Sequence, residues 1–309
     1  MAKDINADVN GDGTVDIHDV NEEIGAVLTD STDKNYDVNQ DGRIDIGDVA
    51  DVIDATIQPA PWDGVQEVKG VTFKMIPVKG GTFTMGSPTT EMGRGTNEGP
   101  QHEVTITKDY YIGETQVTQA LWIAVMGVNP SGHKGNQDLP VENVTWNDCQ
   151  QFIAKLNEMT GKKFRLPTEA EWEFAARGGT LSMGYMFPGC AAPQQGGKPK
   201  EFIWYTSNSN GTTQPVAQKQ PNELRIYDMG GNVFEWCQDW YKYPYPSEPV
   251  TDPTGPASGS MHVYRGGAYN RPVNECRSAY RYMGVQTFKA GHVGLRLALD
   301  LEQKSKPKK

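Results

Sequence analysis

Residues 164–179 read FRLPTEAEWEFAARGG and contain a clear helix start. Thr168 followed three residues later by Glu171 is a capping box, in which each side chain bonds the backbone N–H group of the other residue. The residues after Thr168 predict a short helix that carries Trp172 and Phe174, and Gly178 ends the pattern. This stretch therefore predicts a well-capped helix followed by a turn.

The flanking sequence predicts a mixture of strands and helices. Alternating apolar and polar residues predict strands at residues 71–78, 81–85 and 104–112. Residues 146–160 predict a second helix, with Phe152, Ile153 and Leu156 on one face and Gly161 after its end. The chain contains 34 Gly and 20 Pro, which indicates many turns. Together these features predict an α+β domain rich in loops.

The charge is concentrated at the N-terminus. A length of 309 residues favours two units. Residues 1–58 contain 13 Asp, 2 Glu, 2 Lys and 1 Arg, a net charge of −12, while the whole chain has −10. No apolar run approaches the roughly 20 residues of a membrane helix, so we expect no membrane span. No signal peptide is visible at the start of the sequence.

The acidic segment contains a repeat. Residues 8–19 read DVNGDGTVDIHD and residues 37–48 read DVNQDGRIDIGD. Both fit the D-x-N-x-D-G pattern of EF-hand-type calcium loops, with a glycine at the sharp turn of loop position 6. Calcium prefers six to eight oxygen ligands, so each loop is expected to bind one ion. The predicted ligands, at loop positions 1, 3, 5, 7, 9 and 12, are Asp8, Asn10, Asp12, Thr14, Asp16 and Asp19 in the first loop, and Asp37, Asn39, Asp41, Arg43, Asp45 and Asp48 in the second.

Each loop is followed by an apolar stripe with helical spacing, Val20, Ile24, Val27 and Leu28 after the first and Val49, Ile53 and Ile57 after the second. Two such loop–helix units are expected to bury these stripes against each other. The crowded carboxylates repel one another without cations, so folding is expected to require calcium. The alternative is an acidic, disordered leader.

Residues 4–58 resemble a dockerin, which implies a small all-α double EF-hand-like domain over residues 1–58. The Asp at loop position 12, in place of the EF-hand Glu, is a dockerin feature. The resemblance implies docking onto a cohesin-type scaffold protein through loop positions 10 and 11. These positions are Ile17, His18, Ile46 and Gly47.

Residues 59–70 contain Pro and Gly without periodicity and are expected to be a linker. Residues 71–301 then resemble the formylglycine-generating-enzyme/sulfatase-modifying-factor (FGE-sulfatase) family, which implies an elaborated C-type-lectin-like fold. The matching stretches, in order, are GGTFTMGS (80–87), NEGPQHEVTI (97–106), LPVENVTWNDC (139–149), FRLPTEAEWEFAARGG (164–179), IYDMGGNVFEWCQDWY (226–241), VYRGGAYN (263–270) and HVGLRLAL (292–299). Residues 302–309 form a basic tail, which more often aids solubility than binds nucleic acid.

The resemblance also implies an activity that this sequence does not support. Family oxidases convert a sulfatase cysteine to formylglycine with copper and two cysteines five residues apart, after the Gly-Gly turn. Cys276 is the only cysteine in the equivalent stretch here, and Asn270 and Arg271 lie near the missing one. We therefore assign no catalytic residue and expect a binding or structural module. The alternative is a formylglycine-generating-type oxidase, or a diverged enzyme acting on sulfatases or another substrate in the same cleft.

Two further expectations follow from the resemblance. A third calcium ion is expected at Asp228, Gly231, Val233 and Glu235, with Glu235 as a mere turn cap as the alternative. The four cysteines are Cys149, Cys190, Cys237 and Cys276, and none has zinc-site spacing. Cys237 paired with Cys276 is the favoured disulfide, and buried free thiols are the alternative.

The expected function is that of a secreted or cell-surface modular protein, with a dockerin displaying the second domain. That domain is expected to bind a peptide or glycan through Tyr269 and Arg271. The residues expected to flank this cleft are Tyr264, Tyr269, Arg271, Tyr280, Arg281 and Tyr282, with Trp236 and Trp240 nearby or in the core.

Overall fold

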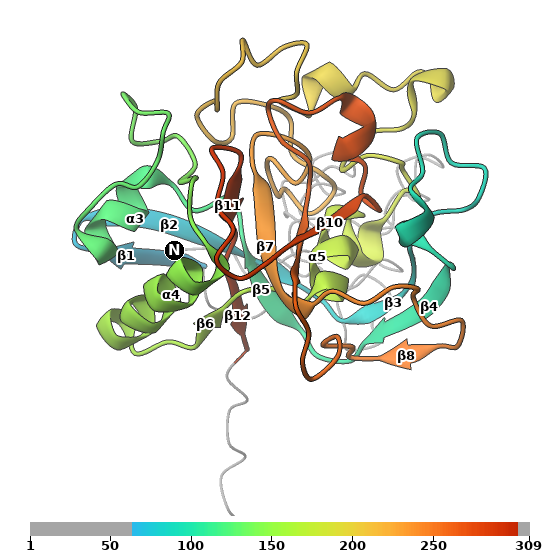
Figure 1. Ribbon diagram of the computed structural model, residues 1–309, viewed down its shortest axis with the longest axis horizontal. Coiled ribbons are helices and arrows are strands. Elements are labelled where there is room, and N and C mark those ends of the chain that lie inside the picture. The colour runs from blue at the N-terminus through green and yellow to red at the C-terminus, as the bar shows by residue number, and fades with distance from the viewer. Residues whose placement is uncertain (1–63, 302–309) are drawn as a thin grey trace, which may run out of the picture. The chain divides into compact units, whose positions relative to one another are not determined.

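The computed structural model describes residues 64–301, which form three small sheets and three α-helices joined by long loops (Figure 1). The largest sheet has the strand order β1-β2-β5-β12-β6. Its strands are β1 (Val65–Val68), β2 (Val71–Val78), β5 (Tyr110–Gly113), β12 (Ala298–Asp300) and β6 (Phe164–Arg165). All its pairings are antiparallel, and β12 brings the end of the domain back between two earlier strands.

The other two sheets are smaller. A four-stranded sheet has the order β10-β9-β7-β11, made of β10 (Arg281–Gly284), β9 (His262–Arg265), β7 (Phe234–Trp240) and β11 (Val293–Leu295). A three-stranded sheet has the order β3-β4-β8, made of β3 (Gly81–Met85), β4 (His102–Ile106) and β8 (Val250–Thr251). The α+β class with abundant loops is confirmed for this domain.

The three α-helices are α3 (Gln119–Met126), α4 (Trp146–Thr160) and α5 (Glu169–Ala176). Helix α4 ends at Gly161 as predicted, with Gly161 in the left-handed conformation at φ 67°, and the side chain of Thr145 caps its start. The predicted capping box of α5 is present, because Thr168 Oγ1 accepts from Glu171 N and Glu171 Oε2 accepts from Thr168 N.

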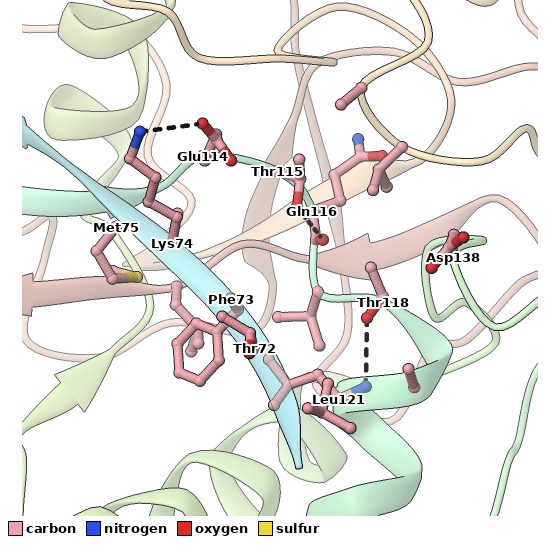
Figure 2. Close-up of a pocket in the computed structure, with 17 residues that line it drawn as sticks. Thr72, Phe73, Lys74, Met75, Glu114, Thr115, Gln116, Thr118, Leu121 and Asp138 are labelled. Carbon is pink, nitrogen blue, oxygen red and sulfur yellow. Dashed lines mark hydrogen bonds and ion pairs between the residues drawn. The ribbon is translucent and has the colours of Figure 1, made fainter. Parts of the chain in front are cut away.

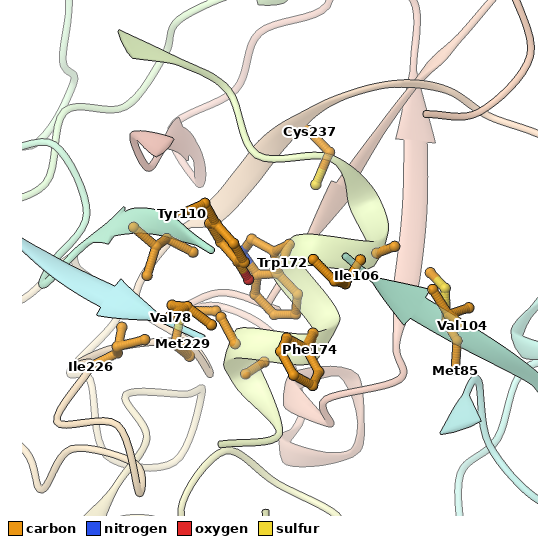
Figure 3. Packing of buried hydrophobic residues seen from close by; sticks show 14 of the residues in the cluster. Val78, Met85, Val104, Ile106, Tyr110, Trp172, Phe174, Ile226, Met229 and Cys237 are labelled. Carbon is orange, nitrogen blue, oxygen red and sulfur yellow. The ribbon is translucent and has the colours of Figure 1, made fainter. Parts of the chain in front are cut away.

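Every residue of α5 is buried, and the helix organises the core. Trp172 and Phe174 project from α5 into a cluster that includes Val78 of β2, Ile106 of β4 and Tyr110 of β5 (Figure 3). The Tyr110 hydroxyl donates to the Glu171 carbonyl at 2.7 Å, so its polar end is satisfied inside this cluster.

Three predicted boundaries differ from the structure. Residues 65–68, expected within the linker, form β1, which pairs with β2 through a turn at Lys69 and Gly70, both with positive φ. Residues 104–112, expected as one strand, are divided between β4 and β5. The predictions contain no helix at α3, whose residues are apolar on most sides and so show no helical stripe.

None of the helices within residues 64–301 combines the length and apolar character that crossing a bilayer requires.

Candidate functional site

The four-stranded sheet has two chemically different faces, because side chains alternate along each strand. Register pairs Trp236 with Tyr264 and Tyr264 with Tyr282, so these aromatic residues share one face, together with Phe234. Glu235, Arg265 and Arg281 are paired in the same way and share the opposite face. We call the first the aromatic face and the second the charged face.

The charged face packs against α5 through buried ion pairs. Arg281 binds Glu169 through two hydrogen bonds of 2.7 and 2.6 Å. Arg265 pairs with Glu173 and lies 3.2 Å from a Glu169 oxygen. Arg281, Arg265 and Glu173 are at most 1% exposed, so each of these charges depends on its partner rather than on water.

The aromatic face presents a patch of rings around Phe234. We call this group of rings the aromatic patch. It consists of Phe234, Tyr264, Tyr280, Tyr282, Phe288 and His292. Phe234 and Tyr264 are buried at the base, with ring centroids 5.0 Å apart. Tyr282 is 45% exposed and forms the outer part of the patch. The patch therefore offers aromatic surface to a ligand.

Three polar side chains lie at the rim of the aromatic patch. The Arg271 guanidinium carbon is 5.9 Å from the Phe234 ring centroid, and Arg271 Nη2 is 3.3 Å from His292 Nε2. Asn270 Nδ2 lies 3.5 Å from the other ring nitrogen of His292. Burial, with a smaller contribution from Arg271, lowers the pKa of His292 to about 4, so the ring is neutral near pH 7. The sequence predicted Arg271 here but not His292, because scattered histidines show no spacing signal.

Several residues predicted to flank a cleft lie elsewhere. The assignment of Arg281 to the cleft is wrong, because its guanidinium is buried on the charged face with Glu169. Tyr269 is 8% exposed, and its ring meets His133 edge-on rather than joining the aromatic patch. Trp236 is fully buried. Trp240 stacks on His262, with centroids 3.7 Å apart.

The residues expected to hold a third calcium ion do converge on one point. Gln116 Nε2 lies 3.2, 3.3 and 2.9 Å from the carbonyl oxygens of Asp228, Gly231 and Val233, and 3.0 Å from Glu235 Oε1. We call these four oxygens the oxygen cage. Gln116 was not predicted, since no sequence pattern connects it to a segment more than a hundred residues away.

The oxygen cage fits a cation better than it fits an amide group. An NH₂ group has two protons for four acceptors, and Gln116 Oε1 is buried with no hydrogen-bond partner. Asp228 Oδ1 is also buried without a partner, and burial raises the pKa of Asp228 to about 6. Rotating the Gln116 amide, whose oxygen and nitrogen are assigned rather than seen, would point Oε1 at the cage as a further ligand.

Gln116 also lines a hollow of about 280 Å³ between β2 and the segment that joins β5 to α3 (Figure 2). Glu235 is held in place by Arg296, which donates to Oε2 at 2.9 Å and to the cage oxygen Oε1 at 2.8 Å, and by Trp172 Nε1, which donates to Oε2 at 2.6 Å. Among residues 64–301, no three His, Cys, Asp or Glu side chains form a metal-binding group, so a cation here would depend on carbonyl oxygens.

All four cysteines are buried free thiols, so the favoured Cys237–Cys276 disulfide is wrong and its alternative holds. Burial raises the pKa of the Cys276 thiol to about 12 and those of Cys149 and Cys237 well above the usual value. Cys276 lies beneath the Gly266-Gly267 turn, where the Gly267 backbone passes so close that a Cβ there would be 2.6 Å from Sγ. These three thiols are therefore neutral and buried, whereas Cys190 lines a hollow.

Both N-terminal calcium loops lie outside the described residues. This applies to every predicted ligand from Asp8 to Asp19 and from Asp37 to Asp48, and to the predicted partner-binding residues Ile17, His18, Ile46 and Gly47.

Comparisons with known proteins agree with this fold. Residues 65–301 match the sulfatase-modifying factor enzyme 1-like domain, FGE-sulfatase. The chain is 31% identical over 256 residues to the chaperone protein LppX of Paenibacillus barcinonensis, spanning 68% of this chain and 83% of that protein. It is 35% identical over 200 residues to the formylglycine-generating enzyme of Streptomyces coelicolor, spanning 59% of this chain and 61% of the enzyme.

The chain is also similar to solved structures. Treponema denticola variable protein 1 has a TM-score of 0.70 and 31% identity, with 78% of this chain and 100% of that chain covered. PvdO from Pseudomonas aeruginosa has a TM-score of 0.63 and 26% identity, with 78% and 100% covered.

Proposed function

Since the chain belongs to the FGE-sulfatase family through residues 65–301, we propose that this domain is a ligand-binding module whose ligand docks on the aromatic patch. One observation carries the proposal: the aromatic face combines an exposed tyrosine with a half-exposed arginine and a neutral histidine. Tyrosine and arginine provide large contact area and several donors at low entropic cost, which is why they dominate binding hot spots.

The chemistry of the thiols supports binding over copper-dependent oxidation. Thiolate is the form that binds Cu(I), and burial disfavours it at Cys276 and Cys237. The runner-up function is a formylglycine-generating-type oxidase, favoured by the similarity to the Streptomyces coelicolor enzyme. Family alone does not confer activity, because the same fold carries different sites.

The N-terminal segment completes the proposal. Residues 1–58 bind two calcium ions through the Asp-rich repeat and dock the protein, outside the cell, onto a cohesin-type scaffold. The support is the in-register repetition of the two loops. Calcium removal is expected to abolish the helical circular dichroism of an isolated 1–60 fragment, and equal helicity in chelator would contradict this part.

The third calcium ion is proposed at the oxygen cage. The Asp228, Gly231 and Val233 carbonyls, Glu235 Oε1 and a rotated Gln116 Oε1 would hold it. A bound calcium ion supplies positive charge that ties together the loop before β7. Equilibrium dialysis of the full chain is expected to give three calcium ions, and two in a Gln116→Leu variant at low free calcium. Two ions in both proteins would remove the third site.

The binding function can be tested by exposed-tyrosine substitutions. Tyr282 of the aromatic patch and Tyr243 of the loop after β7 are 45% and 54% exposed, so they form a matched pair. The full chain is screened against glycan and extracellular-protein arrays. Tyr282→Ala should weaken each hit by roughly 1–3 kcal/mol, and Tyr243→Ala should leave it unchanged.

The oxidase alternative needs a separate assay. The protein is incubated with copper, reductant, oxygen and a Cys-x-Pro-x-Arg peptide, and the product is weighed. Aldehyde at a turnover comparable to that of an active formylglycine-generating enzyme would replace the binding function with the oxidase one.

A further inference from the structure

The rim of the aromatic patch has more hydrogen-bond donors than acceptors. Arg271 Nη2 and Asn270 Nδ2 approach the two ring nitrogens of His292, at 3.3 and 3.5 Å. A neutral imidazole has one N–H group and one lone pair, so only one of the two contacts is a hydrogen bond. In the other contact two N–H groups would face each other, and rotating the Asn270 amide would instead place Oδ1 against the ring N–H. In both arrangements the trio has more N–H groups than acceptors. At least one donor of this trio therefore has no acceptor within it.

Arg271 adds further unpaired donors. Its Nε is buried and makes no hydrogen bond. In the described part of the chain, Arg271 pairs with the carboxylate of Glu275. The Nε···Oε2 distance of this pair is 3.9 Å, which is beyond hydrogen-bond distance. The Arg271 side chain is 37% exposed, so a ligand can reach the guanidinium. The exposed N–H groups of the guanidinium, rather than the buried Nε, are the ones that a ligand acceptor can reach.

We propose that the ligand is an acidic glycan, with a sugar carboxylate bound by Arg271, Asn270 and His292 and its rings lying on Tyr280 and Tyr282. This inference rests on the proposed binding function and names its ligand class. A guanidinium matches a planar carboxylate because two parallel N–H groups meet two oxygens.

The shape of the aromatic patch favours a sugar chain over an acidic peptide. The rings of Tyr280 and Tyr282, which are not buried, are inclined by 23°, so these two rings present nearly parallel surfaces. The hollows next to Gln116 and next to Cys190 lie elsewhere in residues 64–301. An exposed aromatic surface suits the flat C–H faces of pyranose rings better than separate side chains of a peptide.

The test uses the full chain and tetramers of galacturonate, glucuronate and mannuronate in calorimetric titrations at fixed calcium and salt. Methyl-esterified tetragalacturonate has the same rings without the charge, and hexaglutamate provides the peptide arm. The protein variants are Arg271→Ala, Arg271→Lys and Tyr282→Ala. Lys155→Ala is the control, because it removes one positive charge from the exposed side of α4. Unchanged melting temperatures verify that each variant is folded.

At least one uronate tetramer is expected to bind. Arg271→Ala should weaken it at least about tenfold, Arg271→Lys by an intermediate factor because the fork is lost, and Lys155→Ala should have no effect. The ester should bind at least about tenfold more weakly than the acid. Failure of all three uronates, equal binding of acid and ester, or tighter Arg271-dependent binding of hexaglutamate would each overturn the inference.

The outcomes also separate this inference from the proposed function. Ester binding that needs Tyr282 but not Arg271 would leave the aromatic patch as the binding site and remove only the carboxylate. Binding that is insensitive to both residues would refute the patch itself.

Discussion

Replacing Glu173 by glutamine should test whether the buried ion pairs hold α5 against the charged face. Glu173 Oε1 accepts from Gly86 N at 2.8 Å and from Arg177 Nε at 2.9 Å, and Oε2 accepts from Arg265. Burial alone would raise the pKa of Glu173, but Arg177 and Arg265 hold it below the usual value. The carboxylate is therefore charged inside the protein, where it is 0% exposed.

The expected loss of stability depends on the contacts that Arg265 and Arg177 retain in the variant. Removing one partner of a buried ion pair costs about 3–5 kcal/mol. Arg265 keeps a Glu169 oxygen at 3.2 Å, and the Arg177 side chain is 15% exposed to water, so we expect the lower end, about 3 kcal/mol. For a domain of this size, 1 kcal/mol lowers the melting temperature by about 2–4 °C, so a decrease of about 6–12 °C is expected.

Urea unfolding of the full chain followed by tryptophan fluorescence measures this cost. Six of the seven tryptophans lie within residues 64–301, so the signal reports on this domain. Glu114→Gln is the matched control, because the Lys74–Glu114 pair is 3.6 Å apart with side chains 46% and 29% exposed. This control should cost less than about 1 kcal/mol.

The pH dependence provides a second check on the same variant. Because the folded-state pKa of Glu173 is lowered, its stabilising effect is present above the unfolded-state value of 4.5 and is lost as the pH falls through the folded-state value. The stability gap between wild type and Glu173→Gln should therefore narrow in acid. A cost no greater than that of Glu114→Gln, with unchanged urea dependence, would refute the account of α5 anchoring.

Three further outcomes are expected. Burial, with a smaller contribution from the Glu169 charge, raises the pKa of Asp239 to about 8, so the folded state keeps a proton that the unfolded state loses near pH 3.8. The stability of the domain should therefore fall as the pH rises from about 4 to 8. Asp239→Asn should flatten this pH dependence of the melting temperature. Gly267→Ala should destabilise the domain more than Gly127→Ala in urea unfolding, since both glycines have positive φ but only Gly267 has close neighbours, and equal losses would contradict the packing beneath the turn. A thiol reagent should modify none of Cys149, Cys237 and Cys276 in the native protein and all three in denaturant, and rapid native labelling of any of them would show that these thiols are accessible.

Local sequence signals accounted for the well-capped elements. The bounds of α4 were predicted correctly, because Thr145 and Gly161 satisfy or redirect the backbone within a few residues. The start of α5 was predicted for the same reason. By contrast, α3 has no polar face, and β1 has few apolar residues and is stabilised by pairing with β2, so neither leaves a periodic signal.

The site was only partly predictable. Arg271 was placed near the Gly-Gly turn by the motif that carries it. Asp228, Gly231, Val233 and Glu235 could be grouped because they lie close in sequence, and their role as calcium ligands stays a prediction. Gln116 was missed because it reaches these oxygens from the segment that joins β5 to α3.

The sequence by itself determined the family, the caps and strand alternation of the elements, and the absence of a closely spaced cysteine pair, since all of these depend on residues near one another in the chain. Only the tertiary structure decided which charges are buried and which remain at the surface. Arg281 and Tyr282 are adjacent in sequence, yet one is buried with Glu169 and the other is 45% exposed. The reason is that the pleat sends neighbouring side chains to opposite faces, and only packing determines which face α5 covers.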